Sequence, residues 1–466
     1  MEYFKDFDVS VFKAYDIRGI YPRQLNEQLA SLIAQGYLTV ISKKLGKEIA
    51  ELKVAVCRDN RRSSDPLMNE VIKVFLKYGV SVDDLGLLSI NDYYFVVGKY
   101  KYDGGIMATA SHNPPEYGGF KMTIKNTDYK DSIEFISGKA LLEIIQNLDF
   151  PIKAKEIKGQ KNTKNVFDDH LKHLLSFIDF KKIKPLKIVV DTGGGMTGIM
   201  IPHIFAELPC ELIHIFAELD SDFKGRAPNP LSTGAYDALA KKVIASKADL
   251  GIIFDVDGDR MFLVDEQGNF VRGDMVLLIL AKAILIEHPG AGIVYNLICS
   301  HAVKDIVKKW GGKAIRSEVG YMNLARHMRE EGGFMSGEVS GHFAFSQNYY
   351  ADSGFIAMLL AIQAISTDDR PLSAIIEDFH IYAKSDEINV EVDNINLELD
   401  KVRNSYKENI LDEIDGITIE YSDWWFNVRP SNTEPLLRIT VEAKNKKLLA
   451  EKIKEVLAII DYKTMK

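Results

Sequence analysis

Cysteine is scarce in this chain of 466 residues. The three cysteines, Cys57, Cys210 and Cys299, are odd in number, far apart and embedded in apolar runs. A disulfide framework needs paired cysteines, so we expect buried free thiols in a reducing compartment. The class of small, disulfide-stabilised secreted proteins is therefore excluded.

Long apolar runs and excess positive charge are also missing. No window of about 18 uncharged apolar residues occurs, and the N-terminal stretch MEYFKDFDVSVFKAYDIRG lacks the apolar core of a signal peptide. The sequence therefore predicts a cytoplasmic protein with no membrane partner. The formal net charge is −8. A general nucleic-acid or anionic-membrane binder needs a basic surface, so neither kind of partner is expected.

The composition is that of a folded protein with several domains. Hydrophobic residues make up 46% of the chain and charged residues 27%, which argues against a disordered protein. At about 100 to 200 residues per domain, the chain is long enough for three or four domains. A multidomain enzyme is the starting expectation.

One order of elements occurs three times. A β-branched run that ends in a polar or glycine turn precedes a helical stretch at 53–60, 186–195 and 292–300. Two more strand candidates follow each run, at 80–87 and 102–113, at 211–216 and 248–260, and at 313–320 and 331–342. We therefore predict an α/β protein with three similar mixed α/β domains in tandem. Ligands of open α/β sheets bind beyond the carboxyl ends of the strands, so the polar clusters there are expected to face one central cleft.

The C-terminal part has a different pattern. Alternating apolar residues predict strands around 387–395, 416–430 and 436–444, and 448–460 predicts an amphipathic helix. This pattern indicates a smaller C-terminal α+β domain. The Lys-rich segment 153–164 is interpreted as a solvated linker rather than a basic patch. The predicted domains span 1–160, 161–265, 266–375 and 376–466.

Three aspartates follow an apolar strand in the motif DVDGDR: Asp255, Asp257 and Asp259. In a turn their carboxylates converge on a hard cation such as Mg²⁺, and the lack of a neighbouring His or Cys disfavours zinc. An EF-hand calcium loop has the same spacing, but it needs glycine where Arg260 stands and helices on both sides. A solvated acidic turn without a metal is the remaining alternative.

A glycine turn offers a competing interpretation of the second unit. Gly193, Gly195 and Gly198 match the dinucleotide-binding pattern after a strand, with Glu218 about 20 residues further on. The pattern alone is weak, and a turn that precedes the next helix explains the same glycines. Dinucleotide binding therefore stays open as an alternative.

The segment GIMATASHNPPEYGGFK (105–121) ends an apolar strand around one serine, Ser111. His112 is its neighbour, but adjacent residues on an extended chain point apart and no acid is placed to orient the imidazole. A serine-hydrolase triad is therefore not expected. A phosphoryl group on the serine oxygen would add about −1.5 to −2 of charge and give the cation another ligand. A serine that only shapes a turn is the alternative.

Two further loops carry polar groups between strands. The motif GEVSGH (337–342) places a carboxylate, a hydroxyl and an imidazole where sugar hydroxyls would fit, although a structural turn explains it equally well. The motif RPSNTEP (429–435) offers a guanidinium, two hydroxyls and an amide, a set that suits a phosphate group. A rigid proline turn with no ligand is the alternative there.

Together these motifs resemble the α-D-phosphohexomutase family, the phosphomannomutase/phosphoglucomutase enzymes, along essentially the whole chain and in the same order. TASHNPPEYGGFK resembles the family's phosphoserine loop, DVDGDR its metal loop, GEVSGH its sugar-recognition loop, RPSNTEP its phosphate-binding loop and FKAYDIRG (12–19) its N-terminal signature. The resemblance implies an isomerase that interconverts the 6-phosphate and 1-phosphate of mannose, glucose or both. A phosphoserine, a hexose 1,6-bisphosphate intermediate that also serves as activator, and Mg²⁺ are implied with it.

The resemblance also implies a role for particular residues. Ser111 is the implied phosphoserine and, with the three aspartates of DVDGDR, an implied ligand of Mg²⁺. The other implied catalytic residues are Arg18, His112, Lys121 and Arg260, with Lys121 and His342 as candidates for proton transfer. The implied substrate-binding residues are Tyr15, Glu338, Ser340, His342, Arg429, Ser431, Asn432 and Thr433, the last four for the phosphate that is not transferred.

Two positions bear on the choice within the family. The family often has a basic residue just before the Val-Gly pair at 319–320, where this chain has Glu318, so no phosphate or sugar contact is inferred from that loop. Val339 does not separate mannose from glucose. A phosphoglucosamine mutase of the same family and a non-catalytic sugar-phosphate binding protein are the alternatives. The sequence contains no signal for the oligomeric state.

Overall fold

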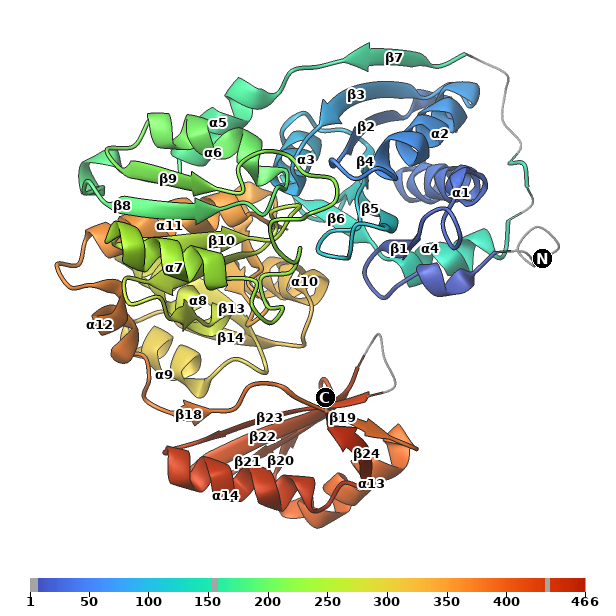
Figure 1. Ribbon diagram of the computed structural model, residues 1–466. Coiled ribbons are helices and arrows are strands. Elements are labelled where there is room, and N and C mark those ends of the chain that lie inside the picture. Colours follow the sequence, from blue (N-terminus) through green and yellow to red (C-terminus); the bar gives the residue numbers. More distant parts are fainter. Residues whose placement is uncertain (1–6, 149, 153–157, 432–435, 466) are drawn as a thin grey trace.

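The computed structural model describes residues 7–148, 150–152, 158–431 and 436–465. Its strands form four sheets, and helices pack on each of them (Figure 1). The three predicted domains with alternating strands and helices correspond to the first three sheets. The smaller C-terminal α+β domain holds the fourth sheet, which lies beyond the third domain in Figure 1.

The first three sheets share one strand order, which confirms the predicted repetition. In each, a central strand pairs in parallel with two neighbours, and one of these pairs with an antiparallel fourth strand. The central strands are β2 (Lys53–Arg58), β8 (Lys187–Asp191) and β13 (Gly292–Asn296). The parallel neighbours are β3 (Ser81–Leu87) and β4 (Gly104–Ala108), β9 (Glu211–Ile215) and β10 (Leu250–Phe254), and β14 (Lys313–Ser317) and β15 (Gly333–Gly337). The fourth strands are β5 (Tyr117–Lys125), β11 (Met261–Asp265) and β16 (Phe343–Phe345).

The remaining elements of the first two domains complete their sheets and cover them. Around the first sheet these are β1 (Ile17–Ile20), α1 (Glu27–Leu45), α2 (Ser64–Lys77), α3 (Ile90–Lys99), β6 (Ile133–Ile136), α4 (Gly138–Ile145) and β7 (Gln160–Thr163). In the second they are α5 (Phe167–Leu175), α6 (Thr197–Ala206), α7 (Asp237–Ser246) and β12 (Phe270–Val271). Strand β7 pairs in parallel with β3, so the described end of the predicted linker is an exposed edge strand.

The second and third domains share one apolar core. The third domain adds α8 (Gly273–Glu287), α9 (His301–Lys309), α10 (Tyr321–Glu331), β17 (Ala351–Asp352), α11 (Gly354–Ser366) and α12 (Leu372–Glu377). Helix α11 is buried along its whole length and packs on α8, as its apolar residues on every face require. The same cluster of buried residues extends to Ile188 and Ile252 of the second sheet. The fourth domain has a separate core. The first domain has one core of its own, and a second apolar cluster around α3 continues to Ala325 and Ala351 of the third domain.

In the fourth sheet, every pair of described strands is antiparallel. Its strands are β18 (Ala383–Lys384), β19 (Ile388–Val392), β20 (Ile410–Asp412), β21 (Ile417–Glu420), β22 (Trp424–Pro430), β23 (Leu436–Ala443) and β24 (Tyr462–Met465), and its helices are α13 (Ile395–Ser405) and α14 (Lys446–Leu457). The alternating pattern at 416–430 thus forms two strands instead of one. The predicted phosphate-binding motif (429–435) begins with the last two residues of β22, Arg429 and Pro430, and β23 follows it in the chain; residues 432–435 lie outside the described residues.

Three further expectations from the sequence concern the cysteines, membrane spans and the domain limits. The cysteines are free, with Cys57 and Cys299 buried and Cys210 half-buried. Among the helices of the described residues, none has the length and apolarity that a membrane span requires. The domain limits inferred from the sequence stay a prediction.

Candidate active site

Ser111 lies in a strained loop just after β4. Its backbone has a φ of 50°, in the left-handed region, and the residue is 1% exposed. A non-glycine residue in this region costs about 1 to 3 kcal/mol, so the surroundings must hold it there. The Ser111 N–H donates to Thr109 Oγ1 at 2.9 Å. The serine is therefore presented in one fixed orientation.

Arg61 holds the rest of the serine loop. Its guanidinium donates to the carbonyl oxygens of Asn113 and Pro114, both at 2.7 Å, and to that of Ser111. The guanidinium is buried and pairs with Asp59 at 3.2 Å. We did not predict this residue. The sequence offered a signal for it, since the polar run RDNRRSS (58–64) begins at the last residue of the strand at 53–58.

The serine and the aspartates come together across two domains. Ser111 Oγ donates to Asp257 Oδ1 at 2.9 Å. Lys121, on β5, donates to Asp257 Oδ2 at 2.8 Å and also to Asp259 Oδ2. Burial by itself lowers the pKa of Lys121, but Asp257 and Asp259 outweigh it and raise the pKa above its ordinary value. Lys121 is therefore a fixed ammonium group beside the serine.

The three aspartates fit a divalent cation. All three are buried, and one carboxylate oxygen from each lies within 4.8 Å of the others. Asp255 Oδ2 and Asp259 Oδ1 have no hydrogen-bond partner. Burial, together with the charges of Asp259 and Asp257, raises the pKa of Asp255 well above its usual value. Carboxylate oxygens are ligands that Mg²⁺ prefers, and a cation would offset the mutual repulsion of these buried carboxylates.

The metal loop and the sugar-recognition loop are directly connected. Arg260 and His342 form an antiparallel backbone bridge, and the Met261 N–H donates to the Gly341 carbonyl at 3.0 Å. Arg260 Nε lies 3.4 Å from His342 Nε2. His342 Nε2 lies 3.5 Å from Asp259 Oδ1. The third domain therefore contributes its loop to the same group of residues.

The polar side chains of the GEVSGH loop bond to one another. Glu338 Oε1 accepts from Asn296 Nδ2 at 3.0 Å and from the Gly320 N–H at 2.9 Å. Ser340 Oγ lies 2.9 Å from His342 Nδ1 and donates to Glu338 Oε2 at 3.4 Å. Glu338 is thus held by two donors on one oxygen, while its second oxygen faces Ser340.

The N-terminal motif reaches two of these loops. The Arg18 guanidinium pairs with Asp16 at 2.7 Å and donates to Asn113 Oδ1 at 2.7 Å. The Tyr15 hydroxyl donates to the Val319 carbonyl oxygen at 3.3 Å. Asp16, which orients Arg18, belongs to the motif but was not among the predicted site residues. The motif therefore links the serine loop to the third domain.

The surroundings of His112 favour its neutral form. Its Nδ1 lies 3.2 Å from Ser111 Oγ. Burial and the positive charges of Arg260 and Arg18 lower the pKa of His112 well below its ordinary value. A neutral imidazole next to the serine is available as a hydrogen-bond partner of either polarity.

Arg429 lies apart from these loops, at the end of β22. It is buried, and its Nη2 pairs with Glu387 Oε2 at 2.7 Å. The neighbouring Asp415 accepts from the Val319 N–H at 3.1 Å, which joins the fourth domain to the third. The Ser431 N–H donates to the Leu436 carbonyl. Asn432 and Thr433 lie outside the described residues.

Glu318 stands where the family often has a basic residue. Its carboxylate contacts two residues of the helix that follows it in the chain. Its Oε1 accepts from Arg326 Nη2 at 2.9 Å, and its Oε2 lies 2.8 Å from His327 Nε2. Both partners belong to α10. The carboxylate charge is therefore compensated within the third domain.

The glycine turn before α6 has a packing reason. The Met196 N–H donates to the Val256 carbonyl at 2.8 Å, and a Cβ atom at Gly195 would lie 2.2 Å from that oxygen. Only glycine permits so close an approach. The turn precedes α6, as the simpler of the two interpretations of this glycine pattern expects, and it also supports the metal loop.

Comparison with known proteins gives the class to which this fold and site belong. Models of the phosphoglucomutase/phosphomannomutase domains match in order: alpha/beta/alpha domain I at residues 9–138, domain II at 165–268, domain III at 272–382 and the C-terminal domain at 387–459. The phosphomannomutase of Methanocaldococcus jannaschii is 37% identical over 97% of this chain and 98% of its own, and that of Vibrio cholerae is 35% identical with the same coverage.

Solved structures agree with this match. A phosphoglucomutase/phosphomannomutase family protein from Burkholderia thailandensis is 27% identical, covers 98% of this chain and 99% of its own, and superposes with a TM-score of 0.85. The open form of the phosphoglucomutase parafusin from Paramecium is 18% identical with a TM-score of 0.75 over 98% and 97% of the two chains, a likeness of fold alone.

The chain belongs to the phosphoglucomutase/phosphomannomutase family. It is a phosphohexomutase, an isomerase that moves a phosphoryl group between positions of a sugar phosphate.

Proposed function

We propose that the protein interconverts hexose 6-phosphates and hexose 1-phosphates, of mannose, glucose or both, through a phosphoserine at Ser111 and a hexose 1,6-bisphosphate. The observation that carries this proposal is the 2.9 Å hydrogen bond from Ser111 Oγ to Asp257 Oδ1. It places a hydroxyl on a strained loop directly beside buried carboxylates that fit a cation. Phosphoryl transfer depends mainly on such positioning and on compensation of charge.

The reaction has two balanced halves. In the first, the bond between phosphorus and Ser111 Oγ breaks while a sugar hydroxyl at C1 or C6 bonds to phosphorus; the sugar hydroxyl loses its proton and Ser111 Oγ regains one. The bisphosphate then turns over, and the second half returns its other phosphoryl group to Ser111. Lys121 and His342 are the candidates for proton movement. Arg18 stays protonated and is suited to stabilising negative charge.

Asp255, Asp257, Asp259 and the Ser111 oxygen would hold Mg²⁺, which when bound offsets the charge of the phosphoryl group. The protein's own cations add to this. Lys121 already contacts Asp257 and Asp259, and Arg260 Nε lies 3.7 Å from Asp255 Oδ2. These residues keep the carboxylates in place before substrate arrives.

The substrate is positioned by two loops in the proposed reaction. Glu338 and Ser340 would bind sugar hydroxyls, and Tyr15 and His342 would contact the same ligand. Arg429, Ser431, Asn432 and Thr433 would hold whichever phosphate is not being transferred. Movement of the fourth domain would admit and release ligand without loss of the bisphosphate. The cytoplasmic location and the predicted domain limits are retained as parts of this proposal.

An assay of three sugar phosphates tests the function. Mannose 1-phosphate, glucose 1-phosphate and glucosamine 1-phosphate are supplied separately with Mg²⁺ and a trace of glucose 1,6-bisphosphate. We expect conversion of the first or second to its 6-phosphate, slower without bisphosphate and abolished by a chelator. Binding of the sugar phosphates without turnover would instead support a non-catalytic binder, and a preference for glucosamine 1-phosphate would indicate the aminosugar branch.

Arg429→Ala is expected to raise the KM for hexose phosphates by about 10- to 100-fold, because a charge-assisted hydrogen bond to phosphate contributes about 1.5 to 3 kcal/mol. We expect a smaller change in kcat, since the same phosphate contact exists before and during transfer. Steady-state kinetics with each hexose phosphate measures both values. The matched control is Arg403→Ala, an arginine on α13 of the same domain that pairs with Glu413 and Asp400. An unchanged KM for Arg429→Ala would remove this residue from the proposed site.

A further inference from the structure

The first turn of α3, in the first domain, touches the metal loop of the second. The Ile90 N–H donates to the Asp257 carbonyl oxygen at 3.2 Å. Asn91 Nδ2 donates to the Gly258 carbonyl oxygen at 2.7 Å. Asn91 is completely buried. Two consecutive carbonyl groups of the loop are therefore held by a helix of another domain.

The third domain also contacts Asn91 and the Gly258 carbonyl group. Asn91 Oδ1 accepts from the Phe355 N–H, at the start of α11, at 3.5 Å. A Cβ atom at Gly354 would lie 2.6 Å from the Gly258 carbonyl oxygen. Asn91 thus bonds to the second domain through one amide atom and to the third through the other. The contact forms only where three domains meet.

Gly258 separates two of the proposed cation ligands. Its φ is 88°, and a Cβ atom there would lie 2.3 Å from Thr197 Cγ2 and 3.0 Å from Asn91 Nδ2. The direction of the Gly258 carbonyl fixes the rotation of the peptide that leads to Asp259. Because Asp257 and Asp259 flank this residue, its orientation determines how far apart their carboxylates lie.

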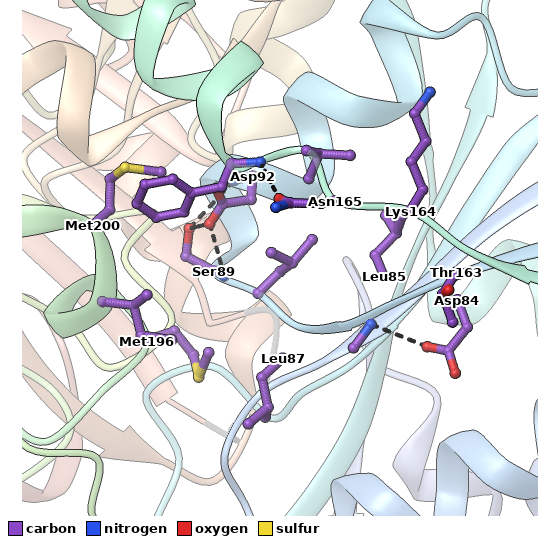
Figure 2. A pocket seen from close by; sticks show the side chains of 15 residues that line it. Asp84, Leu85, Leu87, Ser89, Asp92, Thr163, Lys164, Asn165, Met196 and Met200 are labelled. Carbon is purple, nitrogen blue, oxygen red and sulfur yellow. Dashed lines mark hydrogen bonds between the residues drawn. The ribbon is translucent and has the colours of Figure 1, made fainter. Parts of the chain in front are cut away.

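The start of α3 is itself anchored from behind. Asp92 Oδ2 accepts from the Ser89 N–H at 3.0 Å and from the Ser89 hydroxyl, and Asp92 Oδ1 lies 2.6 Å from His170 Nδ1 on α5. A cavity of about 510 Å³ lies beside this end of α3. Figure 2 shows Ser89, just before α3, and Asp92 among the residues that line it, together with Met196, just before α6, and Met200 of α6. The helix end that presents Asn91 is therefore rigid.

We infer that Asn91 is a positioning residue for the cation site. Its amide fixes the Gly258 peptide, and through it the spacing of Asp257 and Asp259, when the first three domains are docked. The inference rests on the proposed function, because it takes these aspartates to bind Mg²⁺. Residues behind the ligands of a metal commonly change its affinity by about 10- to 100-fold when they are replaced.

Direct cation binding tests this inference. Full-length wild type, Asn91→Ala and Asn91→Asp are titrated with Mn²⁺ under electron paramagnetic resonance and with Mg²⁺ by calorimetry, without substrate. We expect affinity to fall about tenfold or more in both variants. Asn91→Asp keeps the volume and the acceptor for Phe355, so it provides a second measurement if the alanine variant folds poorly.

The matched control is Asn348→Ala. Asn348 is also buried with both amide atoms bonded, to the Ala351 carbonyl at 3.2 Å and to His173 Nε2 at 3.0 Å, and none of its hydrogen bonds reaches the metal loop. Weakened binding in the Asn91 variants with wild-type affinity in the control supports the inference. Affinity within twofold of wild type in the Asn91 variants, or an equal loss in the control, overturns it.

A fourth variant separates this inference from the proposed function. Asp257→Asn is expected to lose cation binding. If it binds as wild type does, the cation does not lie at the aspartates, and the proposed metal site fails together with the role of Asn91. If Asp257→Asn loses binding while Asn91→Ala and Asn91→Asp keep it, only the role of Asn91 fails.

Discussion

Replacing Ser111 by alanine is expected to lower the interconversion of hexose phosphates by about 10⁴-fold or more, because the residue that carries the phosphoryl group is lost. The fold should be unaffected, because removing Oγ costs only its hydrogen bonds to Asp257 and His112. Turnover of mannose 1-phosphate and glucose 1-phosphate measures the effect. Mass spectrometry of wild type after incubation with glucose 1,6-bisphosphate should also locate one phosphoryl group on the peptide that contains Ser111.

Ser366→Ala is the matched control for this experiment. Ser366 is buried at the end of α11, and its hydroxyl has no hydrogen-bond partner. Its removal should leave activity and thermal unfolding as in wild type. Near wild-type turnover by Ser111→Ala, with the control also active, would refute the covalent scheme.

Asp255→Asn is expected to have opposite effects on catalysis and on metal-free stability. We expect turnover to fall about 10³-fold, because the amide is a poor ligand where a carboxylate must bind the cation. Without metal, the variant should unfold at the same temperature as wild type or higher. Burial and the neighbouring Asp259 and Asp257 already favour the neutral acid at this position, and an amide oxygen still accepts from the Gly258 and Arg260 N–H groups.

Thermal unfolding with and without Mg²⁺ checks this prediction. Wild type should be stabilised by saturating Mg²⁺, because a ligand that binds only the folded state raises the unfolding temperature. Asp255→Asn should show no such shift. The control is Asp83→Asn, a buried aspartate of β3 that bonds to Tyr102 and Asn162 away from the metal loop. An undiminished Mg²⁺ shift in Asp255→Asn would contradict the assignment of the cation to these aspartates.

The sequence predicted those features that depend on local pattern. Each third strand of the repeated unit ends in a polar cluster, and the parallel pairing of β4, β10 and β15 with their central strands gives all three the same position in the sheet. The contact of Ser111 with Asp257 follows the expectation that these clusters meet. Short β-branched runs and glycine turns carry this information because strands and turns are set by neighbouring residues.

Features that depend on contacts between domains were not predicted. Asn91 stands in an ordinary helical stretch, and nothing near it in the chain indicates that its amide bonds to Gly258, 167 positions away. The left-handed backbone of Ser111 was not predicted either, because the Arg61 guanidinium, 50 positions away, holds its carbonyl through a tertiary hydrogen bond. The hydrogen bond from the Ser111 N–H to Thr109 Oγ1 is local. The apolar stretch of α11 predicts a buried helix. The spacing of its apolar residues does not indicate that the helix belongs to a core shared by two sheets.

The common core beneath the second and third domains limits which parts of the enzyme are free to reorient. A close-packed interior transmits displacement instead of absorbing it, so the loops at 255–260 and 337–342 should travel as a single rigid body. In the proposed reaction the bisphosphate must turn over, so that its two phosphate groups change places, while these two loops keep their positions relative to each other. The space for that rotation then comes from the fourth domain, and hydrogen exchange during turnover should increase at the Asp415–Val319 junction while α8 and α11 stay protected.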